Sequence, residues 1–169
     1  QDGDYIKEVV VKNEQPTGTI NLDKNIALRE DADTSLIDTS DLSGIEFKLS
    51  AKENIIDMSD GSVIYEKGQE IKKYNLTKDG KLEITNLPIG TYEIEETKTL
   101  NGLVLNTTKY EVKFEQKDLT TKVYTEKLDI SNDTTLVEFS KTDITGDKEL
   151  KGAKLSVLDS DNKVIDEWI

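Results

Sequence analysis

Residues 87–98 read Leu-Pro-Ile-Gly-Thr-Tyr-Glu-Ile-Glu-Glu-Thr-Lys, and this stretch decides the fold class. Pro88 and Gly90 mark a turn, because proline fixes φ and glycine tolerates backbone conformations that other residues avoid. After the turn, Tyr92 and Ile94 alternate with polar residues, which is the period of a strand with one face on a core. The stretch therefore predicts a turn followed by a half-buried strand.

The same alternation recurs on both sides of this stretch. The apolar rows are Val9/Val11, Ile20/Leu22, Ile45/Phe47/Leu49, Leu82/Ile84, Tyr110/Val112/Phe114, Leu128/Ile130 and Val137/Phe139. Further turn signals separate the rows at Asp60-Gly61, Asp79-Gly80, Asn101-Gly102 and Gly146-Asp147. Short strands with this punctuation predict an all-β sandwich. Residues 26–41 are interpreted as a long polar loop with room for one helical turn.

Composition narrows the function classes. The chain has 35 acidic and 22 basic residues and a net charge of −13, which repels nucleic acid and anionic lipid. We therefore expect no nucleic-acid partner and no membrane contact. The absence of Cys and His removes thiol nucleophiles, Ser–His–Asp catalysis and zinc fingers, so we expect no turnover enzyme, no cofactor and no metal. A glycosidase-like carboxylate pair stays open among 35 acidic residues, although no pair stands out.

Several acidic turns raise the question of calcium. They contain Asp57, Asp60, Asp143, Asp147, Asp159 and Asp161. Their spacing matches no EF-hand loop. We interpret them as solvated turns, with a Ca²⁺ site as the alternative.

The chain also repeats itself. The segment 42–47 runs parallel to 150–155, and the segment 9–13 runs parallel to 128–132. Repeats this far apart predict tandem domains. The phase of the repeat makes residues 1–13 the closing strand of a preceding domain, 14–133 a complete domain, and 134–169 the opening strands of a following, incomplete domain.

Three polar residues extend apolar rows of the complete domain. Lys24 continues the row of Ile20 and Leu22, Glu96 that of Tyr92 and Ile94, and Asn132 that of Leu128 and Ile130. Burying a lone charge is costly, but a meeting of these three has a chemical solution. A Lys in an apolar pocket has a lowered pKa and can exist as the neutral, nucleophilic amine. A Glu there stays protonated, so it can hydrogen-bond the Asn side-chain carbonyl and polarise it. The amine then attacks, ammonia leaves, and an amide joins Lys24 to Asn132, once per molecule.

Each residue also has a plainer interpretation. Lys24 could extend its ammonium into water from a strand end, Glu96 could form a surface salt bridge, and Asn132 could be a turn residue. A further alternative is a buried Lys24–Glu96 ion pair that uses Asn132 as a hydrogen-bond partner, with no covalent bond.

Four segments together resemble the Cna-B or SpaA-type repeat domains of Gram-positive surface adhesins and pilins. These segments are 17–24, 44–49, 87–98 and 130–132. The resemblance implies an Ig-like or prealbumin-like β-sandwich in tandem array, with Lys24 as amine donor, Glu96 as catalytic acid and Asn132 as acceptor. It also implies sortase-linked display on the cell wall, outside the cell. The chain departs from the family after Lys98, where Thr99-Leu100 replaces the usual Ala-Pro and Leu103 replaces a Tyr.

Two further residues repeat the pattern without partners. Asn13 would be the acceptor of the preceding domain, and Lys141 the amine donor of the following one. Both are interpreted as orphan isopeptide candidates.

The sequence leaves two functions open besides the disfavoured enzyme. The first is a structural stalk module of a cell-wall-anchored adhesin or pilin, whose partners are neighbouring domains of the same array. The alternative is a ligand-binding adhesin domain that recognises a host or extracellular-matrix component. An exposed aromatic or apolar patch would favour the alternative, and the one Trp of the chain is Trp168.

Overall fold

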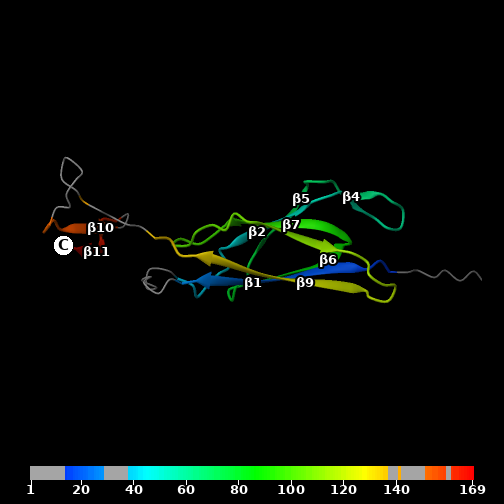
Figure 1. Ribbon diagram of the computed structural model, residues 1–169, viewed down its shortest axis with the longest axis horizontal. Helices are drawn as coiled ribbons and strands as arrows, with labels where there is room; N and C mark the ends of the chain where they lie inside the picture. The colour runs from blue at the N-terminus through cyan, green and yellow to red at the C-terminus, as the bar shows by residue number, and fades with distance from the viewer. Residues whose placement is uncertain (1–13, 29–37, 137–140, 142–150, 159–160) are drawn as a thin grey trace, which may run out of the picture. The chain divides into compact units, whose positions relative to one another are not determined.

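The computed structural model describes residues 14–28, 38–136, 141, 151–158 and 161–169, and every regular element in these residues is a strand (Figure 1). The predicted all-β class is confirmed. The chain divides into two compact units, Gln1–Thr135 and Leu136–Ile169. Within the described ranges, no helix has the length and apolarity needed to cross a membrane.

The first sheet of the larger unit pairs the first described strand of that unit with the last. Its order is β6-β1-β9, and the strands are β1 (Thr17–Ala27), β6 (Lys81–Pro88) and β9 (Val123–Asp133). The central strand β1 is antiparallel to β6 and parallel to β9. The parallel register is unbroken from Thr17 opposite Val123 to Ala27 opposite Asp133.

The second sheet is antiparallel throughout, in the order β5-β2-β7-β8. Its strands are β2 (Glu46–Ala51), β5 (Glu70–Asn75), β7 (Gly90–Lys98) and β8 (Lys109–Phe114). A small hairpin of β3 (Ile55–Ile56) and β4 (Val63–Tyr65) lies in the chain between β2 and β5.

The core lies between the two sheets, and it is made by the alternating rows that the sequence predicts. Buried apolar residues come from β1, β6 and β9 on one side and from β2, β7 and β8 on the other. Tyr92 and Phe114 meet edge to face, with ring centroids 6.1 Å apart. Gly18 is required beside them, because a Cβ there would lie 2.3 Å from the Phe114 ring.

The predicted turns are confirmed where they are described. Gly61, Gly80 and Gly102 all have positive φ angles, which glycine adopts without strain. The loop prediction for 26–41 was wrong at its start, because β1 continues to Ala27. The rows Val9/Val11 and Val137/Phe139 and the turn at Gly146 lie outside the described residues.

The smaller unit contains one antiparallel hairpin, β10 (Leu155–Leu158) with β11 (Val164–Trp168). A turn at residues 151–152 precedes β10, just as a turn at 43–44 precedes β2, in keeping with the sequence repeat. None of this unit's described residues is fully buried. The three-part domain division at residues 13/14 and 133/134 stays a prediction.

Candidate functional site

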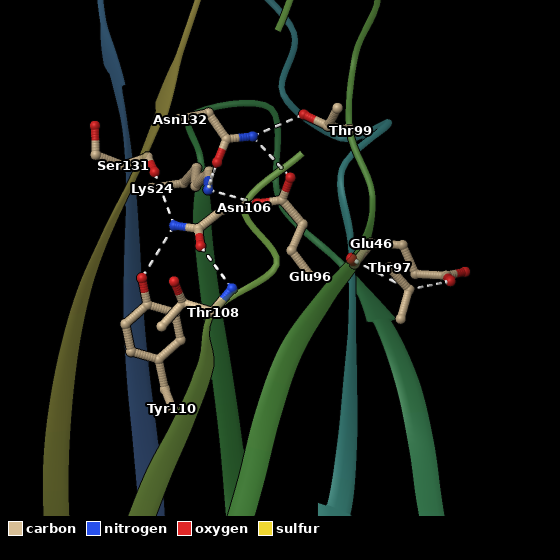
Figure 2. A network of polar contacts seen from close by, with 10 residues as sticks. All are labelled: Lys24, Glu46, Glu96, Thr97, Thr99, Asn106, Thr108, Tyr110, Ser131 and Asn132. Carbon is tan, nitrogen blue, oxygen red and sulfur yellow. Dashed lines mark hydrogen bonds and ion pairs between the residues drawn. The ribbon is translucent and has the colours of Figure 1, made fainter. Parts of the chain in front are cut away.

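The three polar residues that extend the apolar rows meet inside the larger unit (Figure 2). Lys24 on β1 and Glu96 on β7 are each 5% exposed, and Asn132 on β9 is 1% exposed. Lysine and glutamate are almost never this buried unless they are paired. The plainer interpretations of a lysine reaching into water and a surface salt bridge do not fit this burial.

The three side chains form a closed triangle of polar contacts. Lys24 Nζ donates to Glu96 Oε2 at 2.6 Å, and it also donates to Asn132 Oδ1. Asn132 Nδ2 donates to Glu96 Oε1 at 2.7 Å. The carboxylate therefore contacts both nitrogen atoms, one through each of its oxygens.

Strand register explains why the three meet. In the parallel pair of β1 and β9, Lys24 lies opposite Ile130, and Asn132 lies two residues further along on the same face. Glu96 comes from the facing sheet, where it lies opposite Phe47 of β2. One sheet therefore supplies the amine and the amide, and the other supplies the carboxylate.

Backbone and ring contacts fix Lys24 in place. Its N–H donates to the Gly80 carbonyl at 2.8 Å. Gly80 has a φ of +77°, and a Cβ on it would lie 3.0 Å from the Lys24 carbonyl oxygen. The Phe47 ring lies beneath the amine, with Nζ 5.4 Å from the ring centroid. Any residue with a Cβ at position 80 would therefore crowd the Lys24 backbone, which sets the direction of the Lys24 side chain.

Burial favours the neutral form of the Lys24 amine. Loss of hydration lowers the pKa of Lys24 below its ordinary value, while the hydrogen bond and the charge of Glu96 oppose that shift. The net lowering makes the neutral, nucleophilic amine more accessible than in an exposed lysine.

The position of the carboxylate differs from the sequence-based prediction. We expected Glu96 to hydrogen-bond the Asn132 carbonyl, but that oxygen faces Lys24 and the amide nitrogen faces Glu96. The reason is that a lysine ammonium has only donors, so it takes the amide oxygen and leaves the amide hydrogens to the carboxylate.

Sequence reasoning missed two residues around the triangle. Thr99 Oγ1 accepts a second hydrogen bond from Asn132 Nδ2 at 2.8 Å. Asn106 Nδ2 donates to Tyr110 Oη and to the Ser131 carbonyl, each at 3.0 Å, and so ties residues 103–108 to the end of β9 (Figure 2). The one sequence feature that set Thr99 apart was its departure from the Ala of the resembled family. No sequence pattern pointed to Asn106, because residues 103–108 do not form a strand.

Within the described residues, the structure places no isopeptide partner beside either orphan candidate. Lys141 is exposed, and the residues on both sides of it lie outside the described ranges. Asn13 lies outside them as well. Their roles stay predictions.

The acidic turns contain ordinary side-chain to backbone bonds. Asp57 accepts from Ser59, and Asp60 accepts from the Ser62 N–H. Within the described part of the chain, no group of three or more acidic residues gathers as a metal site would require. Asp143, Asp147 and Asp159 lie outside that part.

Comparison with known proteins identifies the family. The chain belongs to the SpaA family of prealbumin-like fold domains, whose model matches residues 33–129. Glu96 lies inside the matched range, and Lys24 and Asn132 lie outside it. No curated protein matches the chain.

Three solved structures are similar to this chain at low sequence identity, and the first two reach a TM-score that indicates a shared fold. GBS52, the minor pilin of Streptococcus agalactiae, is 20% identical with a TM-score of 0.50, over 76% of this chain and 49% of that one. The Bacillus anthracis TIE protein is 20% identical with a TM-score of 0.50, over 93% of this chain and 25% of that one. BcpA, the major pilin subunit of Bacillus cereus, is 23% identical with a TM-score of 0.45, over 69% of this chain and 28% of that one. This chain thus spans less than half the length of each.

Proposed function

We propose that this chain is a structural stalk module of a cell-wall-anchored surface adhesin or pilin, stiffened by an intramolecular Lys24–Asn132 isopeptide bond. The observation that supports this most is the buried triangle: an amine, an amide and a carboxylate in contact inside an apolar core. An ion pair in that position gains little over well-packed apolar residues, since desolvation of two charges offsets their attraction. A reaction that consumes the amine removes that penalty.

The triangle suggests a route for the protons. The Lys24 ammonium first passes one proton to Glu96 Oε2, which frees the lone pair on Nζ. Nζ attacks Cγ of Asn132, and the attacking nitrogen then loses a second proton while the leaving Nδ2 gains one. Both transfers run through the Glu96 carboxyl, because its two oxygens contact the two nitrogens. The Cγ–Nδ2 bond breaks with its electron pair on nitrogen, ammonia leaves, and Glu96 is left protonated.

The proposed bond would suit a stalk, because of where its two residues lie. β1 starts at Thr17 near the entry of the unit, and Asn132 lies one residue before the end of β9. A pull on the two ends would run along β1 to Lys24, cross the bond, and leave through Asn132. Most of the unit would then bear no load. GBS52, which shares this fold, is a minor pilin, and that is compatible with such a role in an extracellular fibre.

A ligand-binding adhesin domain is the alternative function. Its specific support is a group of exposed apolar residues, Ile56, Met58, Val63 and Ile64, on and between β3 and β4. We favour the stalk, because the buried triangle has no role in surface recognition. In either case each chain would form its bond once, without turnover.

Intact mass tests the proposal. Wild-type protein should be lighter than its sequence by one ammonia. Lys24→Ala, Glu96→Ala and Asn132→Ala should each have the full sequence mass. A wild-type mass equal to the full sequence mass would refute the bond and favour the ion-pair alternative.

A further inference from the structure

We propose that Thr99 is a positioning residue for the crosslinking step, holding the nitrogen atom that leaves as ammonia. This inference rests on the proposed Lys24–Asn132 bond.

Hydrogen bonding around the amide supports the role. Asn132 Nδ2 carries two hydrogens, and it donates to Glu96 Oε1 at 2.7 Å and to Thr99 Oγ1 at 2.8 Å (Figure 2). With both hydrogens engaged, the amide plane cannot turn freely about the Cβ–Cγ bond. The amide oxygen is then kept toward Lys24, and Cγ is presented to the amine in a constant orientation.

The end of β7 explains how Thr99 reaches the site. Strand alternation would put residue 99 on the outer face with Thr97, whose hydroxyl instead donates to Glu46 Oε1 at 2.6 Å. Because β7 ends at Lys98, the chain leaves the strand geometry and the Thr99 hydroxyl meets Asn132. Thr99 is half-buried, so Asn132 Nδ2 lies next to a residue that is in contact with solvent.

The hydrogen bond from Asn132 Nδ2 to Thr99 can exist only before the reaction is complete. Nδ2 leaves as ammonia, and the nitrogen of the product amide is Lys24 Nζ. The hydrogen bond from Nδ2 to Thr99 therefore contributes to the starting arrangement and to the departure of the leaving group, and it contributes nothing to the crosslinked product. A purely structural threonine would stabilise the product as well.

The test follows crosslinking in time. The full chain is made by cell-free translation, translation is stopped, and ammonia loss is followed by intact mass. Thr99→Val keeps the shape and removes the hydroxyl, and it should slow the reaction about five- to tenfold, the usual worth of one hydrogen bond. Thr99→Ser should restore the wild-type rate. The matched control Thr97→Val, two residues away and bonded to Glu46, should react like wild type.

A second measurement separates positioning from structure. Once fully crosslinked, Thr99→Val and wild type should have the same denaturation midpoint. A Thr99→Val rate equal to wild type would overturn the role of Thr99 and leave the crosslink intact. A slowed rate with an equally destabilised product would also overturn it, in favour of a structural threonine. A wild type that never loses ammonia would overturn both this inference and the proposed function.

Discussion

Lys24 and Asn132 are 108 positions apart in the sequence, yet their side chains touch, because β1 and β9 are parallel neighbours in one sheet. The parallel register places Ile26, not Lys24, directly opposite Asn132. The long lysine side chain spans this two-residue offset on the inner face. The contact therefore depends on the topology of the whole unit, and its consequences reach the whole unit.

The proposed bond should raise stability strongly. It closes a 108-residue separation, which by the chain-entropy argument for cross-links stabilises by about 4–5 kcal/mol. Glu96→Gln should lose that amount in guanidinium unfolding, and reductant should leave the wild type unchanged. The matched control is Glu95→Gln, whose carboxylate pairs with Lys48 on the outer face and should matter little. Equal unfolding free energies for Glu96→Gln and wild type would contradict the bond.

The bond should also change the mechanical response. When the two ends of the chain are pulled in a single-molecule experiment, the crosslinked wild type should never release the residues between Lys24 and Asn132. Glu96→Gln should unfold at moderate force and lengthen by the full extended length of that segment, about 3.3–3.6 Å per residue. A wild-type trace that shows the same lengthening as Glu96→Gln would rule out the proposed force path.

The free amine of Lys24 should give the stability of the Glu96→Gln variant a pH dependence that the crosslinked wild type lacks. In Glu96→Gln the lysine stays a titratable group, and burial keeps its folded-state pKa below the unfolded value of about 10.4. Between those two pKa values the unfolded chain binds more protons, so the unfolding free energy should rise as pH rises. In a crosslinked wild type Lys24 would be an amide and would not titrate.

The measurement is the difference between the two unfolding free energies from neutral pH to about pH 10. Taking the difference cancels the other lysines, which titrate in both proteins. The stability of the variant should approach that of wild type as pH rises. A difference that is constant with pH would mean that Lys24 does not change protonation in this range.

Gly80 should be needed for the placement of Lys24. Gly80→Ala introduces a Cβ 2.8 Å from Leu42 Cδ1 and 3.0 Å from the Lys24 carbonyl oxygen, at a φ of +77°. Gly61→Ala is the matched control, because its φ is +76° and a Cβ there has nothing within 4 Å. Both variants should carry the backbone penalty of about 1 kcal/mol, and only Gly80→Ala should also slow crosslinking. Equal crosslinking rates in the two variants would show that the close approach is unimportant.

The sequence predicted the strands and the triangle because both follow from a period of two. Lys24, Glu96 and Asn132 were found by extending apolar rows by two positions, and strand geometry preserves that relation. The period ends where a strand ends. Thr99 lies just after β7, so alternation assigns it to the outer face, whereas the structure brings its hydroxyl to Asn132.

The pairing of strands could not be predicted from one sequence. That β9 lies parallel to β1, and that the carboxylate contacts the amide nitrogen, depends on how distant segments pack. The position of residues 103–108 depends on the hydrogen bonds from Asn106 to Tyr110 on β8 and Ser131 on β9. No local sequence pattern encodes these contacts. Local periodicity therefore predicts which residues face the core, and packing decides which of them touch.

Peptide mapping of the wild type tests the central claim most directly. Protease digestion followed by tandem mass spectrometry should yield one branched peptide that joins the Lys24 segment to the Asn132 segment, lighter than the two linear peptides together by one ammonia. The same digest of Glu96→Gln should yield the two linear peptides. Recovery of unmodified Lys24 and Asn132 peptides from folded wild-type protein would contradict the account.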